Sequence, residues 1–150
     1  MKPQDQEFLH EPEKGVLGDC LRACVASVLE VDRAEVPHFV ALGVGDTDDE
    51  GLEWWFELQN WLSTRELECW YLAKEEFEPE LVSFASYGEL LVSGKTVRGG
   101  GKVSHVCVAE PDGSVLHDPH PSRAGLISID GYYLFAPIGT WAEVYETMMR

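Results

Sequence analysis

Positively charged residues are scarce in this sequence. Its 150 residues include 11 Lys and Arg against 27 Asp and Glu, so the formal net charge is −16. Such a surface repels the phosphate backbone of nucleic acids and anionic membranes. We therefore expect neither a nucleic-acid partner nor a membrane partner. The charge is consistent with simple solubility and also with attraction to a basic partner, and charge alone does not separate the two.

The N-terminal segment also lacks the long hydrophobic run that a targeting signal needs. The first fourteen residues, MKPQDQEFLHEPEK, hold no apolar segment, so we expect no signal peptide and no membrane span. Cysteines number only four, and a chain without a secretory signal keeps them as free thiols. A chain of this length can fold without a disulfide or a metal. We expect one cytoplasmic domain over residues 1–150 that needs no cofactor.

The first part of the chain predicts an irregular arm followed by a buried helix. Residues 1–18 are rich in proline, glycine and charge. Apolar side chains then follow helical spacing from Leu21 to Leu29. Asp19 stands directly before this stripe, where an N-cap side chain accepts the free N–H groups of the first turn. This arrangement places Cys20 in the first turn of the helix.

Two more helices are expected before the middle of the chain. Asp32 to Glu35 resembles a capping box that opens a short helix ending near Pro37. A longer helix is expected to begin around Thr47–Asp49 and to end near Ser63. The apolar face that the spacing predicts for it comprises Leu52, Trp55, Phe56, Gln59 and Leu62, with Trp54 and Trp61 outside this face, packing elsewhere or bordering a cleft.

The second half of the chain changes to the short alternating segments that are typical of strands. These segments are ECWYLA, ELLVS, SHVCVAE, SVLHD and YYLFAP, and they are separated by glycine, proline and serine. The segment TWAEVYETMM predicts a short terminal helix. Because helices come first and mainly antiparallel strands follow, the predicted class is α+β.

Residues 104–121, SHVCVAEPDGSVLHDPHP, predict a β-hairpin whose turn is Glu-Pro-Asp-Gly at residues 110–113. With Pro and Asp at the tip, His105 lies directly opposite Asp118, and a bulge at Gly113 would shift this pairing by one residue. Cross-strand partners have Cβ atoms roughly 4.5–5.5 Å apart, which suits an imidazole–carboxylate hydrogen bond. Such a bond would fix the tautomer of the histidine and stabilise its protonated form.

Cys20 has the position of a reactive thiol. A thiol at a helix N-terminus meets unpaired N–H groups and the positive end of the helix dipole, and both stabilise the thiolate. Asp19 opposes this by adding negative charge, so a positively charged partner is still needed. A plain core cysteine is the alternative interpretation of this segment. Cys24, one turn later, and Cys69, within an apolar run, are expected to be buried packing residues.

These segments resemble the motifs of a known family. Residues 19–24, Asp-Cys-Leu-Arg-Ala-Cys, resemble the nucleophile motif Asp-Cys-Gly-x-x-Cys of the bacteriocin leader peptidases, a branch of the papain-like cysteine peptidases. Residues 105–108 and 115–119 resemble their His and Asp-Pro strands. The chain is most similar to small papain-like proteins of tailed phages and bacteria, which share a Gly-Asn/Asp-Cys-x-x-Ala-Cys-x-Ala-Ser helix and a His-Asp-Pro-His-Pro segment. Residues 40–100 lie outside the resemblance.

The resemblance implies a papain-like fold, with the cysteine helix packed on an antiparallel sheet. Cys20 would be the nucleophile, His105 the general base and then acid, and Asp118 the residue that orients the histidine. The reaction would hydrolyse a peptide, amide or isopeptide bond through a thioester. A phage-encoded member would work in the cytoplasm of its bacterial host, and the charge suggests a basic peptide or protein substrate.

The oxyanion hole departs from the leader-peptidase pattern. Those enzymes carry a glutamine shortly before the nucleophile, and residues 14–18 of this chain contain none. Gln6, or else Gln4, would supply the side-chain donor if the arm folds over the site, with the Cys20 N–H as the other donor. Leu21 stands where the leader peptidases have glycine, which puts close approach of a substrate at this point in doubt.

Two other interpretations remain open at this stage. A structural zinc site is one, although we expect no metal because Cys24 lies in a buried stripe and His117 points away from Asp118 along its strand. A catalytically weak or inactive papain-like phage protein that binds and inhibits a basic host partner is the other. The oligomeric state is open in every case. The potential zinc ligands are Cys20, Cys24, His105, Cys107, His117 and His120.

Overall fold

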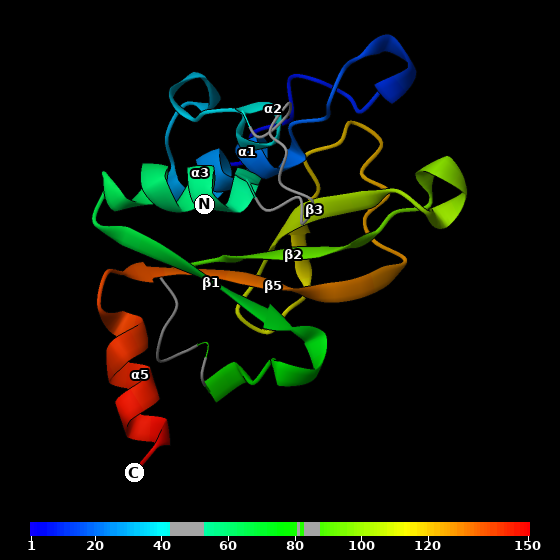
Figure 1. Cartoon of the computed structure of the whole chain (residues 1–150). Helices are drawn as coiled ribbons and strands as arrows, with labels where there is room; N and C mark the ends of the chain where they lie inside the picture. Colours follow the sequence, from blue (N-terminus) through cyan, green and yellow to red (C-terminus); the bar gives the residue numbers. More distant parts are fainter. Residues whose placement is uncertain (43–52, 81, 83–87) are drawn as a thin grey trace.

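The protein is built on a five-stranded antiparallel sheet whose strands lie in the order β1-β5-β2-β3-β4 (Figure 1). The computed structural model describes residues 1–42, 53–80, 82 and 88–150. The α+β class predicted from the sequence is confirmed. The strands are β1 (Leu67–Ala73), β2 (Leu90–Lys95), β3 (Ser104–Ala109), β4 (Val115–His117) and β5 (Ser128–Pro137).

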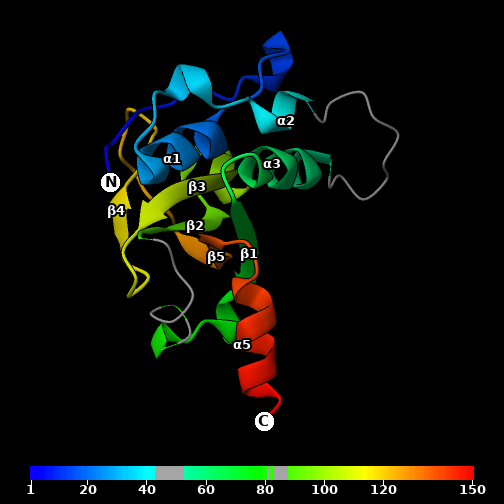
Figure 2. The same cartoon turned by 90° about the vertical axis from the view of Figure 1, so that its left-hand side faces the viewer.

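Three helices cover one face of the sheet, and the C-terminal helix extends from the end of β5 (Figure 2). Among the described residues, no helix combines the length and the apolar character needed to cross a membrane. The helices are α1 (Cys20–Leu29), α2 (Phe39–Leu42), α3 (Glu53–Ser63) and α5 (Thr140–Met148).

Side chains from both faces of the sheet are buried, because successive strand residues point to opposite sides. One core cluster joins α1 and α3 to the helix-covered face, and the strand residues in it are Cys69, Leu91, Val108 and Phe135. A second cluster includes Val144 of α5. Its strand residues are Trp70, Leu72, Leu90, Val92, Cys107, Ala109, Tyr132 and Leu134.

Helix α1 begins at the predicted residue, but Asp19 does not cap it in the predicted way. With φ −112° and ψ 36°, Asp19 lacks the extended backbone that turns a capping side chain toward the helix N–H groups. Its carboxylate is fully buried and accepts a hydrogen bond from the backbone N–H of Phe8 at 2.8 Å. It also lies 3.4 Å from the Arg22 guanidinium. Asp19 therefore anchors the N-terminal arm to the helix.

The N-terminal arm runs across α1 and is fastened at several points. Its only described helical piece is a 3₁₀ turn at Pro12–Lys14. Lys2 donates its backbone N–H to the Ser27 carbonyl at 2.9 Å. The Gln4 side chain is also used structurally, since its oxygen accepts from the Arg33 N–H at 2.7 Å. The arm thus folds back over the helix, which is the condition for Gln6 to approach Cys20.

Helix α3 ends where the sequence predicts, and its buried face is predicted only in part. The expected start at Thr47–Asp49 and Leu52 lie outside the described residues, and the helix ends at Ser63. Of the predicted face, Leu62 is fully buried and Trp55 packs against the core, whereas Phe56 is 54% exposed. Leu58, which the predicted face omits, is fully buried. The α3 residues in or against this core cluster are Trp54, Trp55, Leu58, Trp61 and Leu62.

The short helix expected before Pro37 is a 3₁₀ turn, Arg33–Glu35. The Asp32 side chain accepts from the Ala34 N–H, one residue before the N–H that a capping box uses. The segments predicted as strands and as a terminal helix are all found. The strand bounds differ from the sequence patterns by a few residues.

The hairpin of β3 and β4 forms around the predicted turn, in a different register. The Gly113 N–H donates to the Glu110 carbonyl at 2.8 Å, which closes the turn. Val108 faces His117, and a β-bulge lies between Val108 and Ala109. The predicted pairing would have placed Val115 opposite Val108. Leu116 is the extra residue of this bulge, and it shifts the register of β4. Because β4 also ends at His117, Asp118 is not the cross-strand partner of His105.

Candidate active site

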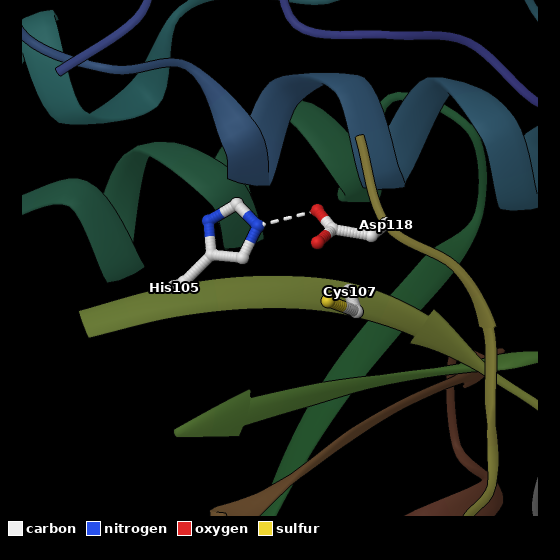
Figure 3. Close-up of side chains that lie close together, drawn as sticks. All are labelled: His105, Cys107 and Asp118. Atoms are coloured by element: carbon white, nitrogen blue, oxygen red, sulfur yellow. Dashed lines mark hydrogen bonds and ion pairs between the residues drawn. The ribbon is translucent and has the colours of Figure 1, made fainter. Parts of the chain in front are cut away.

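His105 and Asp118 form a buried side-chain pair (Figure 3). The Nε2 atom of His105 lies 2.7 Å from Oδ1 of Asp118, and each residue is only 4% exposed. His105 comes from β3, and Asp118 from the segment that follows β4. The shifted register does not prevent the contact, because the two side chains turn toward each other beyond the end of β4. The hydrogen bond expected from the sequence is therefore present.

Asp118 is held by backbone N–H groups as well as by the histidine. The N–H of His120 donates to Oδ1 at 2.9 Å, and the N–H of Gly125 donates to Oδ2 at 2.7 Å. Burial raises the pKa of this carboxyl group, but the hydrogen bonds from His105, His120 and Gly125 outweigh it and hold the pKa far below its ordinary value. Asp118 is thus a fixed carboxylate that faces the imidazole.

This carboxylate favours the protonated form of His105. Burial lowers the pKa of the imidazole, but hydrogen bonding to Asp118, and then to Cys107 and Cys20, outweighs it and raises the pKa from 6.5 to about 11. The histidine is therefore an imidazolium at neutral pH. An imidazolium is the positively charged neighbour that a helix-tip thiol needs in order to ionise.

Cys20 is the first residue of α1 and is partly exposed. It lines the same cavity as His105, and its sulfur is one of the groups that raise the pKa of that histidine. Helix α1 packs on β3, and this packing brings the helix tip to the histidine strand. The structure thus brings together all three residues that the sequence singled out as a triad.

Gln6 also reaches the site. Its side chain is 9% exposed and lines the cavity that holds Cys20. One amide hydrogen is donated to the Phe8 carbonyl at 2.8 Å. The Oε1 atom is buried and has no hydrogen-bond partner among the described residues. The backbone N–H of Gln6 donates to the Pro119 carbonyl at 3.1 Å, which ties the arm to the segment carrying Asp118.

A salt bridge that the sequence analysis missed fastens this part of the arm. The guanidinium of Arg123 donates to Asp5 at 2.9 Å through Nη2 and to the Asp118 carbonyl at 2.6 Å through Nη1. The His117 ring nitrogen Nε2 lies 2.9 Å from the Gln4 carbonyl. No sequence motif marks Arg123, because its role depends on two segments 118 residues apart in the chain. These contacts hold the two residues that precede Gln6.

The cavity has a volume of about 1030 Å³ and crosses the helix-covered side of the sheet. Leu21 lines it next to Cys20 and is 5% exposed. Trp54, which the sequence placed at a cleft border, is one of the lining residues.

Three of the described residues lie close enough together to be considered as a zinc site. The ligand atoms of His105, Cys107 and Asp118 lie within 4.8 Å of one another, and all three residues are buried (Figure 3). Burial raises the pKa of the Cys107 thiol, so the thiolate that a metal requires is disfavoured there. Both Asp118 oxygens already accept hydrogen bonds. These three side chains are therefore better described as an ion pair between His105 and Asp118 with the Cys107 thiol beside it than as a metal site.

The remaining candidate zinc ligands have other partners. The Cys24 sulfur donates to the Val106 carbonyl at 3.4 Å, and His120 Nδ1 accepts from the Ser122 N–H at 3.0 Å. Burial raises the pKa of both the Cys24 and the Cys69 thiols well above their ordinary value. These two cysteines are core residues, as the sequence predicted.

Comparisons of this chain with protein-family models, with curated proteins and with solved structures find no match. The candidate site therefore rests on its own geometry.

Proposed function

We propose that this protein is a cysteine-dependent hydrolase of papain-like type, with Cys20 as nucleophile, His105 as acid–base and Asp118 as the residue that orients the histidine. The observation that carries the proposal is the buried 2.7 Å contact between Asp118 and His105, which lines the same cavity as Cys20. A histidine held protonated beside a thiol at a helix tip favours a thiolate–imidazolium pair.

The proposed reaction begins with attack of the Cys20 thiolate on a carbonyl carbon. The carbonyl oxygen becomes an oxyanion, for which the Cys20 backbone N–H and the second amide hydrogen of Gln6 are the proposed donors. His105 gives its proton to the leaving amine as the C–N bond breaks, which leaves a thioester on Cys20. The neutral imidazole then takes a proton from water, and the hydroxide formed attacks the thioester. Departure of the thiolate releases a carboxylic acid and restores the pair.

The proposed substrate is a peptide or protein with an amide or isopeptide bond, and the net charge of −16 favours a basic one. The four cysteines are all free, which supports a reducing compartment such as the cytoplasm. The proposed mechanism uses only side chains and backbone groups of this chain.

Trapping of the thioester tests this proposal. An activated peptide ester is mixed with the protein, and the intact mass is recorded after an acid quench. We expect an added acyl group on Cys20 in the wild type. In His105→Ala we expect acylation of Cys20 to be slow and to reach only a trace. The matched control is Cys69→Ala, which removes a buried thiol and should leave acylation unchanged. Acylation that persists in Cys20→Ala, or that never occurs in a folded wild type, would contradict the proposal.

A further inference from the structure

The far end of the cavity has the chemistry of a cation-binding subsite. The cavity floor crosses four strands of the sheet, from Tyr71 on β1 through Tyr133 on β5 and Ser93 on β2 to His105 on β3. Three strand spacings separate β1 from β3 in the sheet, which is about 14 Å. The cavity therefore has two ends, and the thiol with its histidine occupies only one of them.

Three aromatic rings form the other end, and we call them the aromatic corner: Trp54, Tyr71 and Tyr133. The ring centroids of Trp54 and Tyr133 are 6.0 Å apart and steeply inclined, and those of Tyr71 and Tyr133 are 5.0 Å apart. Tyr71 is 44% exposed, and the other two rings are partly buried. Such a corner offers π faces at its surface and little conformational freedom.

A carboxylate stands beside the aromatic corner because of a β-bulge. Ser93 of β2 pairs with Gly131, and Gly94 pairs with Ile129, so Asp130 is the extra residue between them. A bulge redirects the side chain of the extra residue, and Asp130 lines the cavity. Burial is the main cause that raises the pKa of Tyr71 and Tyr133, and the negative charge of Asp130 adds to both shifts.

Two glycines make this arrangement possible. A Cβ on Gly94 would overlap the Ser128 carbonyl, so only glycine lets β2 approach the bulge so closely. A Cβ on Gly131 would overlap the Tyr71 hydroxyl and the Leu72 carbonyl. The phenol of Tyr71 therefore lies across Gly131, directly after Asp130. The backbone of β5 at Gly131 therefore fixes the Tyr71 ring close to the residue that carries the Asp130 carboxylate.

We infer that the aromatic corner and Asp130 bind a lysine or arginine side chain of an extended peptide whose backbone crosses the cavity toward Cys20. Aromatic faces attract cations, a carboxylate pairs with them, and an acidic protein concentrates them. An extended peptide advances about 3.3 Å per residue, so the basic residue lies about four residues from the bond presented to Cys20. This inference rests on the proposed function for the identity of that bond, while binding itself does not require catalysis.

The experiment is protection of Cys20 from alkylation. The probe is an acetylated, amidated nonapeptide with lysine at its centre and alanine elsewhere, so that it can reach Cys20 in either direction. Matched peptides carry norleucine or glutamate at the centre. Iodoacetamide modification of Cys20 is followed by mass spectrometry as a function of peptide concentration. We expect half-protection by the lysine peptide at a concentration about tenfold lower than by the norleucine peptide, a difference of about 1.4 kcal/mol.

The variants decide whether Asp130 causes the preference. Asp130→Asn should reduce the lysine preference from about tenfold to about threefold, because the aromatic faces keep their attraction for the cation. Asp112→Asn removes the same charge from the β3–β4 turn, outside the cavity lining, and should keep the preference. Acetyl-lysine amide, which is too short to span the cavity, should not protect Cys20. Equal protection by all peptides in the wild type, an undiminished tenfold preference in Asp130→Asn, or protection by acetyl-lysine amide would each overturn the inference.

Failure of the proposed function gives a different result. In that case the rate of Cys20 alkylation without peptide does not depend on His105, whatever the peptides do. The lysine preference, its reduction in Asp130→Asn and its survival in Asp112→Asn would remain measurable, because they report binding alone. The two claims can therefore fail separately.

Discussion

His105 and Asp118 meet at 2.7 Å although they are not cross-strand partners. Val108 pairs with His117, and β4 ends there, so Asp118 reaches the histidine from the segment beyond the strand. The backbone N–H groups of His120 and Gly125 fix the carboxylate in this place. The contact is thus held by a local loop in addition to the sheet.

Replacement of Asp118 by asparagine should weaken the proton affinity of His105. An asparagine offers no negative charge, so the pKa of the imidazole should fall from its raised value while the fold is kept. We expect the acylation rate of Cys20 at neutral pH to drop by about 10²–10⁴. Single-turnover acylation by an activated peptide ester measures it. An unchanged rate would show that Asp118 only supports the loop.

Stability should depend on pH through the same pair. The pKa of His105 is raised to about 11, so its contribution is fully present below its unfolded value near 6.5 and is lost as the pH rises through 11. The pKa of Asp118 is lowered, so its contribution is present above about 3.8 and is lost as the pH falls below that value.

Thermal unfolding of the wild type and of His105→Gln from pH 5 to pH 11 checks the basic side. We expect the Tm advantage of the wild type to be largest near pH 6 and to shrink steadily toward pH 11, by roughly 2–4 °C for each kcal/mol lost. An advantage that grows between pH 7 and pH 10 has the wrong sign and would contradict the raised pKa of His105.

Gln6 should affect acyl transfer without affecting the thiol. Gln6→Ala removes the proposed oxyanion donor, and loss of one such donor typically lowers the rate by about 10²–10³. Alkylation of Cys20 by iodoacetamide forms no oxyanion, so its rate and pH profile should stay as in the wild type. Gln4→Ala is the comparison, because the side-chain amide of Gln4 forms its hydrogen bonds with the backbone of Val31 and Arg33, away from the cavity. Equal loss of acylation in both variants would indicate a general effect of loosening the arm.

Arg123 should act by positioning the arm. Its guanidinium is half exposed, so we expect Arg123→Ala to change the free energy of unfolding only slightly. Hydrogen exchange of residues 4–8 should nevertheless become faster, because the bonds to Asp5 and the Asp118 carbonyl are gone. Arg65→Ala, which removes a guanidinium stacked on Trp61, is the control and should leave this exchange unchanged. Unchanged exchange in Arg123→Ala would show that the other contacts suffice to hold the arm.

The elements of the fold follow from local patterns that the sequence displays. Helical spacing after Asp19 and alternation in the second half predict α1 and the strands, because these periods arise from neighbouring residues. The buried face of α3 was predicted only in part, since Leu62 is buried as expected but Phe56 is exposed and Leu58 is buried, and packing against the sheet decides this. The Asp19 side chain was also assigned wrongly, since its partner is Phe8 in the arm.

The candidate site was predictable in its residues and less so in its geometry. Two segments resembling family motifs placed Cys20, His105 and Asp118, and the structure brings them together. The register was not predictable, because the bulge at Leu116 of β4 leaves no clear mark in the sequence. Asp130 was missed for a similar reason, since its place beside Tyr71 depends on a bulge between β2 and β5.

The most direct test of the account is the alkylation rate of each cysteine as a function of pH, read by mass spectrometry, in the wild type and in His105→Ala. We predict that Cys20 alone reacts rapidly well below the ordinary thiol pKa of about 8.5, and that His105→Ala abolishes this. Slow reaction of Cys20, with the pH profile of an ordinary thiol in both proteins, would contradict the central claim that His105 and Cys20 form a reactive pair.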